Sequence, residues 1–308
     1  MRVRLILFLT LAAAGAQVTA PAVRVDAVQL FRDVETLAAD DMEGRLAGSP
    51  GGRKAREYVR ERLKQSGVTP VGAGFDQRFT FTARNAGERH GTNLVGAIRG
   101  ARNPSRYIVM TAHYDHIGVR EGQVFNGADD NASGVAALLA VSDHFARTRP
   151  DHSLLIAALD AEESGLHGAR ALLRDPPVPL SAMIVNVNLD MVGRDPANRL
   201  FAAGTYHYPF LAPYLEAVAQ PPIVLEFGRD RPGGPDDWTN SSDHYVFHQA
   251  GIPFLFFSVD DLDHHHKASD DAATIGREFL AGAAATIIGA VYRLDRHLDE
   301  IAGRRREQ

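Results

Sequence analysis

Four short apolar runs, each followed at once by polar residues, constrain the fold of this chain more than any other feature. They span residues 107–112, 153–159, 183–189 and 252–259, and they lead into His113, Asp160, Asp190 and the segment 260–271. Runs of this length, rich in Val, Ile, Leu and Phe, are typical of strands buried on both faces of a largely parallel sheet. Ligands of such sheets bind beyond the carboxyl ends of the strands. The polar residues after the four strands are therefore expected to meet at one place.

Segments with helical periodicity separate these runs. The clearest span residues 133–145 and 275–294, and two more, around residues 30–38 and 53–65, precede the first run. Residues 75–82 and 93–98 read as further strands. The pattern predicts an α/β fold: a single globular domain over about residues 25–302, with a mostly parallel central sheet flanked by helices and a metal site at the carboxyl ends of the strands.

Residues 1–22 have the features of a cleaved export signal. Arg2 and Arg4 precede the apolar run 5–14, and small residues follow, with candidate cleavage positions after Ala16 and Ala22. This run is shorter than the about 20 apolar residues that a membrane-spanning helix needs. We therefore expect an exported protein, periplasmic or extracellular, that keeps no stable membrane anchor after cleavage.

Composition limits the chemistry of the site. The chain of 308 residues has no cysteine, so disulfides, zinc–thiolate sites and cysteine nucleophiles are excluded, and any metal must be held by His, Asp and Glu. Lys and Arg number 33 against 38 Asp and Glu, and no block of basic residues stands out in the body of the chain. A nucleic-acid partner is therefore not expected.

Two polar segments follow or precede predicted elements in a way that suits metal ligands. In the first, His113 and Asp115 have a spacing that would let a carboxylate support a ligating imidazole, while His116 is expected at the surface or lining a pocket. In the second, Asp129 and Asp130 lie between glycines before a helix. Two interpretations remain open there: Asn131 or Ser133 caps the helix and the acids complement its dipole, or one aspartate bridges metals.

Three further clusters lie after buried strands. Glu162 and Glu163 are adjacent, which suits a division of labour in which one ligates a metal and the other moves a proton; an exposed acidic loop is the alternative. Asp190 ends the third run, and residues 264–266 are three consecutive histidines. Together these donors suit zinc without thiolates, and five ligands with one shared carboxylate would hold two metals about 3.5–4 Å apart.

The order and local sequence of these segments resemble a known family. The stretches are 113–115, 127–134, 162–165, 188–191 and 266–270, together with 44–49 and 242–245. They are similar to the co-catalytic di-zinc aminopeptidases, which are bacterial secreted leucyl aminopeptidases related to glutamate carboxypeptidases and glutaminyl cyclases. The resemblance extends over about residues 28–295.

The resemblance implies two Zn²⁺ ions per chain. Residue by residue, it implies that His113 and Asp190 hold one zinc, that Glu163 and His266 hold the other, and that Asp130 bridges them. It also implies that Glu162 is the general base and acid, that Asp115 supports His113, and that the peptide bond after Asp130 is cis. The implied function is an exported aminopeptidase that releases residues from peptides with a free amino terminus.

The chain departs from the family pattern at some positions, and the same site chemistry is compatible with other activities. Many relatives have a tyrosine before the last zinc histidine, able to donate to the developing oxyanion, and this chain has His265 there. The stretch from Phe79 to Arg106 is too short for the protease-associated domain of larger relatives. Side chains of residues 254–257 or Trp238 could line a pocket for the first residue. The alternatives are glutaminyl-cyclase-like or carboxypeptidase activity at the same site, or a binding ectodomain without catalysis.

Overall fold

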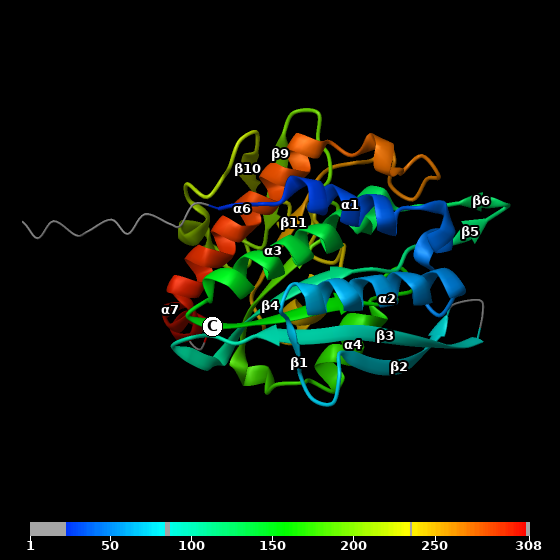
Figure 1. The fold of residues 1–308 in the computed structure, drawn as a ribbon. Helices are drawn as coiled ribbons and strands as arrows, with labels where there is room; N and C mark the ends of the chain where they lie inside the picture. The colour runs from blue at the N-terminus through cyan, green and yellow to red at the C-terminus, as the bar shows by residue number, and fades with distance from the viewer. Residues whose placement is uncertain (1–22, 84–86, 235, 306–308) are drawn as a thin grey trace, which may run out of the picture.

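A nine-stranded sheet runs through the middle of the computed structural model, which describes residues 23–83, 87–234 and 236–305 (Figure 1). The export signal predicted for residues 1–22 lies outside the described residues. In spatial order the strands are β1 (Thr69–Pro70), β3 (Gly87–Ile98), β7 (His152–Leu159), β4 (Asn103–His113), β8 (Met183–Leu189), β11 (Phe254–Ser258), β9 (Arg199–Ala203) and β10 (Val224–Phe227), and β2 (Asp76–Ala83) pairs with β3.

The four central strands, β7, β4, β8 and β11, are parallel and coincide with the four apolar runs. The expected mostly parallel centre is thus confirmed. At the sides, β3 is antiparallel to β7 and β9 is antiparallel to β11. Strands β9 and β10 were not expected from the sequence, because each has only four or five residues and β10 is partly exposed.

The order of the central strands creates a switch point at β4. The chain passes from β4 to its neighbour β7 and then crosses to β8 on the other side of β4. Crossovers on the two sides of β4 therefore diverge, and the carboxyl ends of these strands face one crevice. His113, Asp160 and Asp190 stand at those ends.

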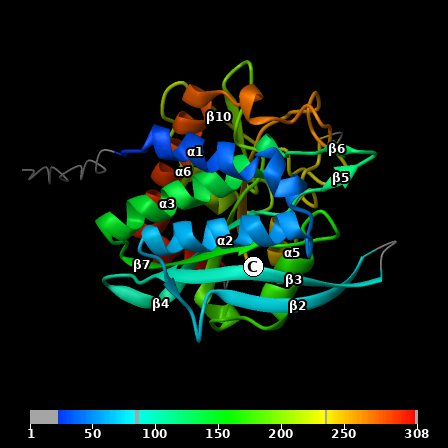
Figure 2. The same ribbon diagram turned by 45° about the vertical axis from the view of Figure 1, so that its right-hand side comes forward.

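Helices cover both faces of the sheet (Figures 1 and 2). One face carries α1 (Ala27–Leu37), α2 (Pro50–Gln65), α3 (Gly134–Thr148) and α6 (Arg277–Arg296), and the other carries α4 (His167–Arg174) and α5 (His244–Gln249). Helix α7 (Leu298–Arg305) follows α6, and β5 (Val119–Arg120) and β6 (Gln123–Val124) form a separate hairpin. Within the described ranges, no helix is both long and apolar enough to cross a membrane.

Short helical turns complete the fold. They are the 3-10 segments η1 (Asp40–Arg45), η3 (Leu180–Ala182), η4 (Pro209–Leu215) and η5 (Ala272–Thr274), and the π-helical segment η2 (Ala128–Ser133).

Alternate side chains of the central strands pack into two separate cores. In β7, Leu154 and Ile156 join the core under α1, α2, α3 and α6, whereas Leu155 and Leu159 join the core under α4 and α5. This alternation follows from the two-residue period of a strand. Every residue of β7 is buried, which explains why its sequence is a continuous apolar run rather than an alternating one.

Arg45 connects the polar loops at the carboxyl edge of the sheet. Its guanidinium is fully buried and donates hydrogen bonds to four backbone carbonyls: Leu37 (2.6 Å), Tyr114 (2.9 Å), Asn126 (2.5 Å) and Gly127 (2.9 Å). Burial lowers its pKa to about 10, although nearby carboxylates, Asp130 foremost, oppose this shift. One side chain therefore fixes the loop after β4 and the loop before η2 relative to α1.

Replacing this guanidinium should destabilise the protein strongly. In Arg45→Met the four buried carbonyls lose their donor, and each buried unsatisfied group costs about 1–3 kcal/mol. We expect the free energy of unfolding, measured by urea denaturation, to fall by about 3 kcal/mol or more. The control is Arg53→Met, which removes one exposed bond to the carbonyl of Gly48 and should cost less than about 0.5 kcal/mol. Equal losses in the two variants would contradict this role of Arg45.

Candidate metal centre

The polar residues that follow the central strands converge on one cavity, as the sequence predicted. The cavity has a volume of about 390 Å³. Its lining includes acids from the loops after β7 and β8, the histidine pair after β11, and Asp130 from η2. The lining residues used below are Asp130, Glu162, Glu163, Asp190, Met191, Trp238, Phe256, Asp260, Asp261, Leu262, His265 and His266.

One group of donors consists of His113, Asp130 and Asp190. His113 Nε2 lies 3.4 Å from Asp130 Oδ1 and 3.3 Å from Asp190 Oδ1. All three residues are buried. Their ligand atoms lie close enough together to surround one ion.

A second group forms on the other side of Asp130. His266 Nε2 lies 3.2 Å from Asp130 Oδ2 and 3.0 Å from Glu163 Oε2. The two carboxylate oxygens of Asp130 therefore face two different histidines, with Oδ1 toward His113 and Oδ2 toward His266. This is the arrangement of a carboxylate that bridges two metal positions. The peptide bond between Asp130 and Asn131 is cis, as the resemblance implied.

The donor atoms have the environment of metal ligands. Among the described residues, His113 Nε2, Asp190 Oδ1 and Glu163 Oε1 are buried without a hydrogen-bond partner. Buried polar atoms of this kind are rare in native proteins and are often explained by an ion. The nitrogen-to-oxygen distances of 3.0–3.4 Å are close to the about 3.3 Å that separates neighbouring ligands of a tetrahedral zinc. The residues therefore fit zinc at both positions.

His116 is the residue whose expected place was wrong. Its side chain is fully buried, so it is not at the surface, and it is not among the residues that line the cavity. Nδ1 lies 2.7 Å from Glu163 Oε1 and 3.8 Å from Asp130 Oδ2. His116 thus forms a further metal-compatible group with these two acids. The sequence places His116 close to His113, but only the path of the chain after β4 turns its ring toward the second position.

Charges within the cluster shift the pKa values of its members. Burial opposes ionisation of Asp130, but the imidazoles of His116 and His113 hold the pKa of Asp130 well below its usual range. The carboxylates of Asp130 and Glu163 raise the pKa of His266 to about 10. Because a metal needs the deprotonated imidazole, metal binding at this position must release a proton.

Glu162 lies in a different electrostatic environment from Glu163. Burial raises the pKa of Glu162 well above its usual range, and neighbouring carboxylates, Asp243 first among them, outweigh the opposing His113. Burial and the charge of Asp130 oppose ionisation of Glu163, but the nearby imidazoles of His116 and His266 hold the pKa of Glu163 below its usual range. The two adjacent glutamates therefore differ: Glu163 favours the ionised form, which can bind a metal, and Glu162 can carry a proton.

Asp115 contacts both His113 and the loop that carries Glu162. His113 Nδ1 lies 3.1 Å from the backbone carbonyl of Asp115 and 3.6 Å from its carboxylate, so the carbonyl is the nearer partner. The Asp115 carboxylate instead accepts the backbone N–H of Glu162 at 3.0 Å. The predicted support of His113 thus comes mainly from the main chain, and the Asp115 side chain positions the loop of Glu162.

The segment 127–134 is tied to the end of β8 by its small polar residues. Asn131 Oδ1 accepts from the N–H groups of Gly134 and Met191, and Ser133 Oγ accepts from Val192 N–H. Asp129 Oδ1 accepts from Gly193 N–H at 2.7 Å. The capping interpretation therefore holds for Asn131, which also fixes Asp130 relative to Asp190.

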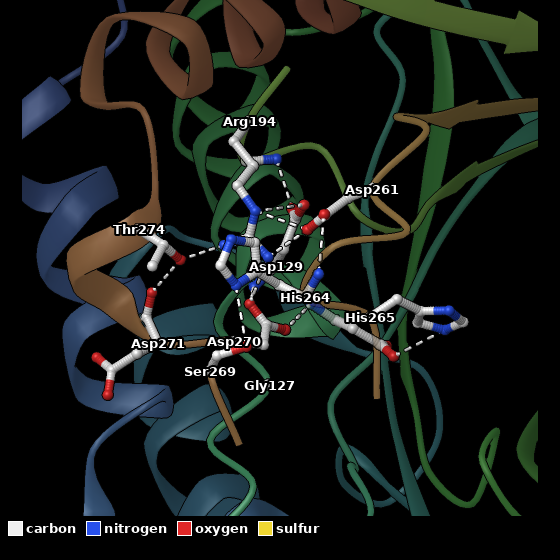
Figure 3. Close-up of polar contacts among 12 residues, drawn as sticks. Gly127, Asp129, Arg194, Asp261, His264, His265, Ser269, Asp270, Asp271 and Thr274 are labelled. Atoms are coloured by element: carbon white, nitrogen blue, oxygen red, sulfur yellow. Dashed lines mark hydrogen bonds and ion pairs between the residues drawn. The ribbon is translucent and has the colours of Figure 1, made fainter. Parts of the chain in front are cut away.

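Arg194 and Asp270 hold the histidine loop on the same segment (Figure 3). The carboxylate of Asp270 accepts the backbone N–H groups of Asp129 (2.9 Å) and Asp130 (3.0 Å). Arg194 donates to Asp270 (2.9 Å) and to Asp261 (2.6 Å). These contacts fix the segment that carries His265 and His266 against the backbone of Asp129 and Asp130. Arg194 could not be found from the sequence, since a single arginine in a loop gives no signal.

Asp243 is a further buried acid at the site that sequence reasoning left without a role. Among the described residues, neither of its carboxylate oxygens has a hydrogen-bond partner. Burial and the charges of Asp115 and Asp190 raise its pKa to about 7, against the opposing charge of His113. The only indication of Asp243 in the sequence was the segment 242–245, which was noted solely as part of the family resemblance.

The structure shows which of the side chains expected near the site line the cavity. Trp238 and Phe256 line the cavity, whereas Phe254 and Phe257 are fully buried in the core. His265 also lines the cavity; its side chain is 41% exposed, and Nε2 lies 3.5 Å from Asp130 Oδ2.

Comparisons with known proteins agree with this geometry. The chain is 33% identical over 182 residues to a "Probable zinc metalloprotease" of Leptosphaeria maculans, an alignment that covers 53% of this chain and 37% of that relative. Alignments with the first curated relatives cover 27–37% of their lengths, so the chain spans well under half of them.

Solved structures match nearly the whole chain. A zinc aminopeptidase from Bacillus subtilis superposes with a TM-score of 0.71 at 17% identity, covering 88% of this chain and 96% of that one. A glutaminyl cyclase from Porphyromonas gingivalis has a TM-score of 0.70 at 20% identity, covering 90% and 98%. At these identities the likeness shows the fold, and it confirms the expected α/β architecture.

A family model supplies the classification. The model of peptidase family M28 matches residues 93–291, which is more than half of the chain and contains His113, Asp130, Glu163, Asp190 and His266. The resemblance found in the sequence is thereby confirmed, and the chain belongs to peptidase family M28.

Proposed function

We propose that this protein is a zinc-dependent aminopeptidase with two zinc ions per chain. The observation that carries the proposal is the orientation of Asp130, whose two oxygens face His113 and His266 at 3.4 and 3.2 Å. The names of two similar proteins, the probable zinc metalloprotease of Leptosphaeria maculans and the zinc aminopeptidase of Bacillus subtilis, support the zinc-peptidase part of the proposal. In this proposal His113, Asp130 and Asp190 hold one zinc, and Asp130, Glu163 and His266 hold the other.

Glu162 moves the proton in this proposal. Zinc supplies Lewis-acid polarisation of the scissile carbonyl when it is bound. Glu162 accepts a proton from the attacking water and then delivers it to the departing amine. Burial raises the pKa of Glu162, which suits a group that must both take up and return a proton. The hydrogen bond from Glu162 N–H to Asp115 fixes the backbone at this step.

The charge of the cavity favours an amino terminus over a carboxylate as the recognised end of the substrate. Of the described residues that line the cavity, six are acidic and none is Lys or Arg. Asp260 and Asp261 pair with Arg229 and Arg194, so the charge available to a ligand comes from the acids near the proposed metals. A terminal carboxylate therefore finds no lysine or arginine side chain among these lining residues to pair with, whereas a terminal ammonium meets no positively charged lysine or arginine there. This supports aminopeptidase over carboxypeptidase activity.

The apolar part of the cavity suits an apolar first side chain. Met191, Trp238, Phe256 and Leu262 line it. Burying an apolar side chain contributes about 1.5–3 kcal/mol to binding. We therefore propose peptides with a free amino terminus and an apolar first residue as substrates. An exported protein, cut after Ala16 or Ala22, is part of the same proposal.

Glutaminyl-cyclase-like activity is the alternative that a specific observation favours, because a glutaminyl cyclase has the same fold. A panel of aminoacyl-anilides, assayed with and without chelator and added zinc, distinguishes the two functions. Release of the aniline from apolar aminoacyl substrates is the expected result. Pyroglutamate formation from amino-terminal glutaminyl peptides without anilide cleavage would contradict the aminopeptidase proposal. A protein that binds zinc but acts on neither substrate would instead be a binding ectodomain.

Metal analysis tests the bridging role of Asp130. We expect about two zinc ions per purified chain by elemental analysis, loss of activity with a chelator, and recovery on adding zinc. Asp130→Ala should lose metal from both positions, because each uses one oxygen of Asp130. Asp263→Ala removes an exposed acid from the same loop as His266 and should leave the metal content unchanged. One metal per chain, unaffected by Asp130→Ala, would contradict the bridge.

The adjacent glutamates form their own matched pair of variants. Glu162→Gln should keep both metals and the fold while kcat falls about 10²–10⁴-fold, the usual contribution of a general acid–base group. Glu163→Gln should instead lower the affinity for zinc, because its carboxylate contacts His266. If Glu162→Gln loses metal and Glu163→Gln keeps it, the two roles are reversed.

His265 is proposed to donate a hydrogen bond to the developing oxyanion, in the place where relatives have tyrosine. It lines the cavity beside Asp130. We expect His265→Ala to lower kcat about 10²–10³-fold with little change in KM, and His265→Tyr to restore part of the loss. His264→Ala is the neighbouring control, since His264 contacts Ser269 instead. An unchanged kcat in His265→Ala would refute this role.

A further inference from the structure

The imidazole of His116 occupies a position that the implied set of zinc ligands does not use. The ring is fully buried, and Nδ1 lies 2.7 Å from Glu163 Oε1 and 3.8 Å from Asp130 Oδ2. Within the described part of the chain, neither ring nitrogen has a hydrogen-bond partner. A buried imidazole normally satisfies at least one nitrogen, so this one requires an explanation.

An ordinary hydrogen bond to Glu163 does not explain the contact. The two atoms are close enough, but both His116 Nδ1 and Glu163 Oε1 remain without a partner because they are not aligned as donor and acceptor. His113 Nε2 and Asp190 Oδ1 show the same combination of a short separation, 3.3 Å, and missing hydrogen bonds. At that pair the implied explanation is a shared metal. The same explanation applies to His116.

The distances suit four ligands around one ion. His116 Nδ1 lies 2.7 Å from Glu163 Oε1 and 3.8 Å from Asp130 Oδ2. His266 Nε2 lies 3.0 Å from the other Glu163 oxygen, Oε2, and 3.2 Å from the same Asp130 oxygen. These values bracket the about 3.3 Å between neighbouring ligands in a tetrahedron of zinc–ligand bonds of about 2.0–2.1 Å. The two imidazole rings are 6.0 Å apart between centroids, which leaves room for an ion between the nitrogens.

The backbone leaves space for the ring in this place. A Cβ atom at Gly127 would lie 2.5 Å from His116 Cδ2, so only glycine allows the ring to pack there. The φ of Gly127 is also positive, at +55°. Arg45 holds the Gly127 carbonyl. The wall behind His116 is therefore built to hold the imidazole with Nδ1 toward Glu163.

We propose that His116 is a fourth protein ligand of the metal position formed by Asp130, Glu163 and His266. The other position has three protein ligands, His113, Asp130 and Asp190. The two positions are thus unequal, and the one with His116 retains its zinc longer against a chelator. This inference rests on the proposed function only in assuming resident metals, and it is independent of which peptide is cleaved.

Zinc affinity provides the first test. In His116→Ala we expect the tighter of the two zinc dissociation constants, measured by competition with a chromophoric chelator, to rise more than about 100-fold. Loss of an outer hydrogen-bond partner of a ligand costs only about 10–100-fold. His90→Ala, which removes an exposed histidine on β3, is the control and should bind zinc as the wild type does.

Cobalt spectroscopy provides the second test, and it uses the absence of cysteine from this chain. In His116→Cys the introduced thiolate can ligate, because Nδ1 lies close to the backbone and a metal–sulfur bond of about 2.3 Å compensates for the shorter side chain. Loading this variant with Co²⁺ should produce a thiolate-to-cobalt charge-transfer band in the near ultraviolet. His90→Cys should produce none.

The outcomes separate this inference from the proposed function. Ligation by His116 is supported if the tighter zinc dissociation constant rises as expected in His116→Ala and the charge-transfer band appears in His116→Cys. This holds even if the wild type cleaves no aminoacyl-anilide. A zinc affinity within about 100-fold of the wild type in folded His116→Ala and no band in His116→Cys overturn it, even if the wild type is an active aminopeptidase. If His116→Ala fails to fold, the presence or absence of the band in His116→Cys decides.

Discussion

Burying many carboxylates at one edge of a sheet is the constraint on which the rest of this structure depends. Seven aspartates are buried around the cavity: Asp115, Asp129, Asp130, Asp160, Asp190, Asp243 and Asp270. Each uncompensated charge in such a place costs several kcal/mol. Arg45 and Arg194 supply fixed positive charge, and proton uptake meets part of the remainder, since burial raises the pKa of Asp160 to about 7. Metal ions at the two donor groups would neutralise the acids closest to the cavity.

The same network ties the site to several distant segments through hydrogen bonds that need no metal or substrate. Arg45 fixes the carbonyl of Gly127, Asp270 accepts the N–H groups of Asp129 and Asp130, and Asn131 and Ser133 bind the chain after β8. Asp130 is therefore held from three directions by segments far apart in sequence. Ligands fixed in this way need little reorganisation, which favours both metal affinity and catalysis.

Sequence reasoning reached the donor residues of both groups because most of them come soon after a buried strand, and Asp130 comes before a buried helix. His113, Asp190 and Glu163 stand at ends that a parallel sheet brings to one edge. It misplaced His116, because the direction of a side chain in the loop after β4 depends on Arg45 and Gly127, which approach from elsewhere in the chain. Strands β9 and β10 were missed because strands of four or five residues are too short for a long apolar run, and β10 is also partly exposed.

The sequence by itself determined the α/β class, the four parallel strands and the residue types available for metal binding, because strand periodicity and the lack of cysteine are local properties. Only the tertiary structure decided which oxygen of Asp130 faces which histidine, which glutamate has the raised pKa, and that His116 lies beside Glu163. Those outcomes depend on burial and on distances between segments far apart in the chain, and no local pattern encodes them.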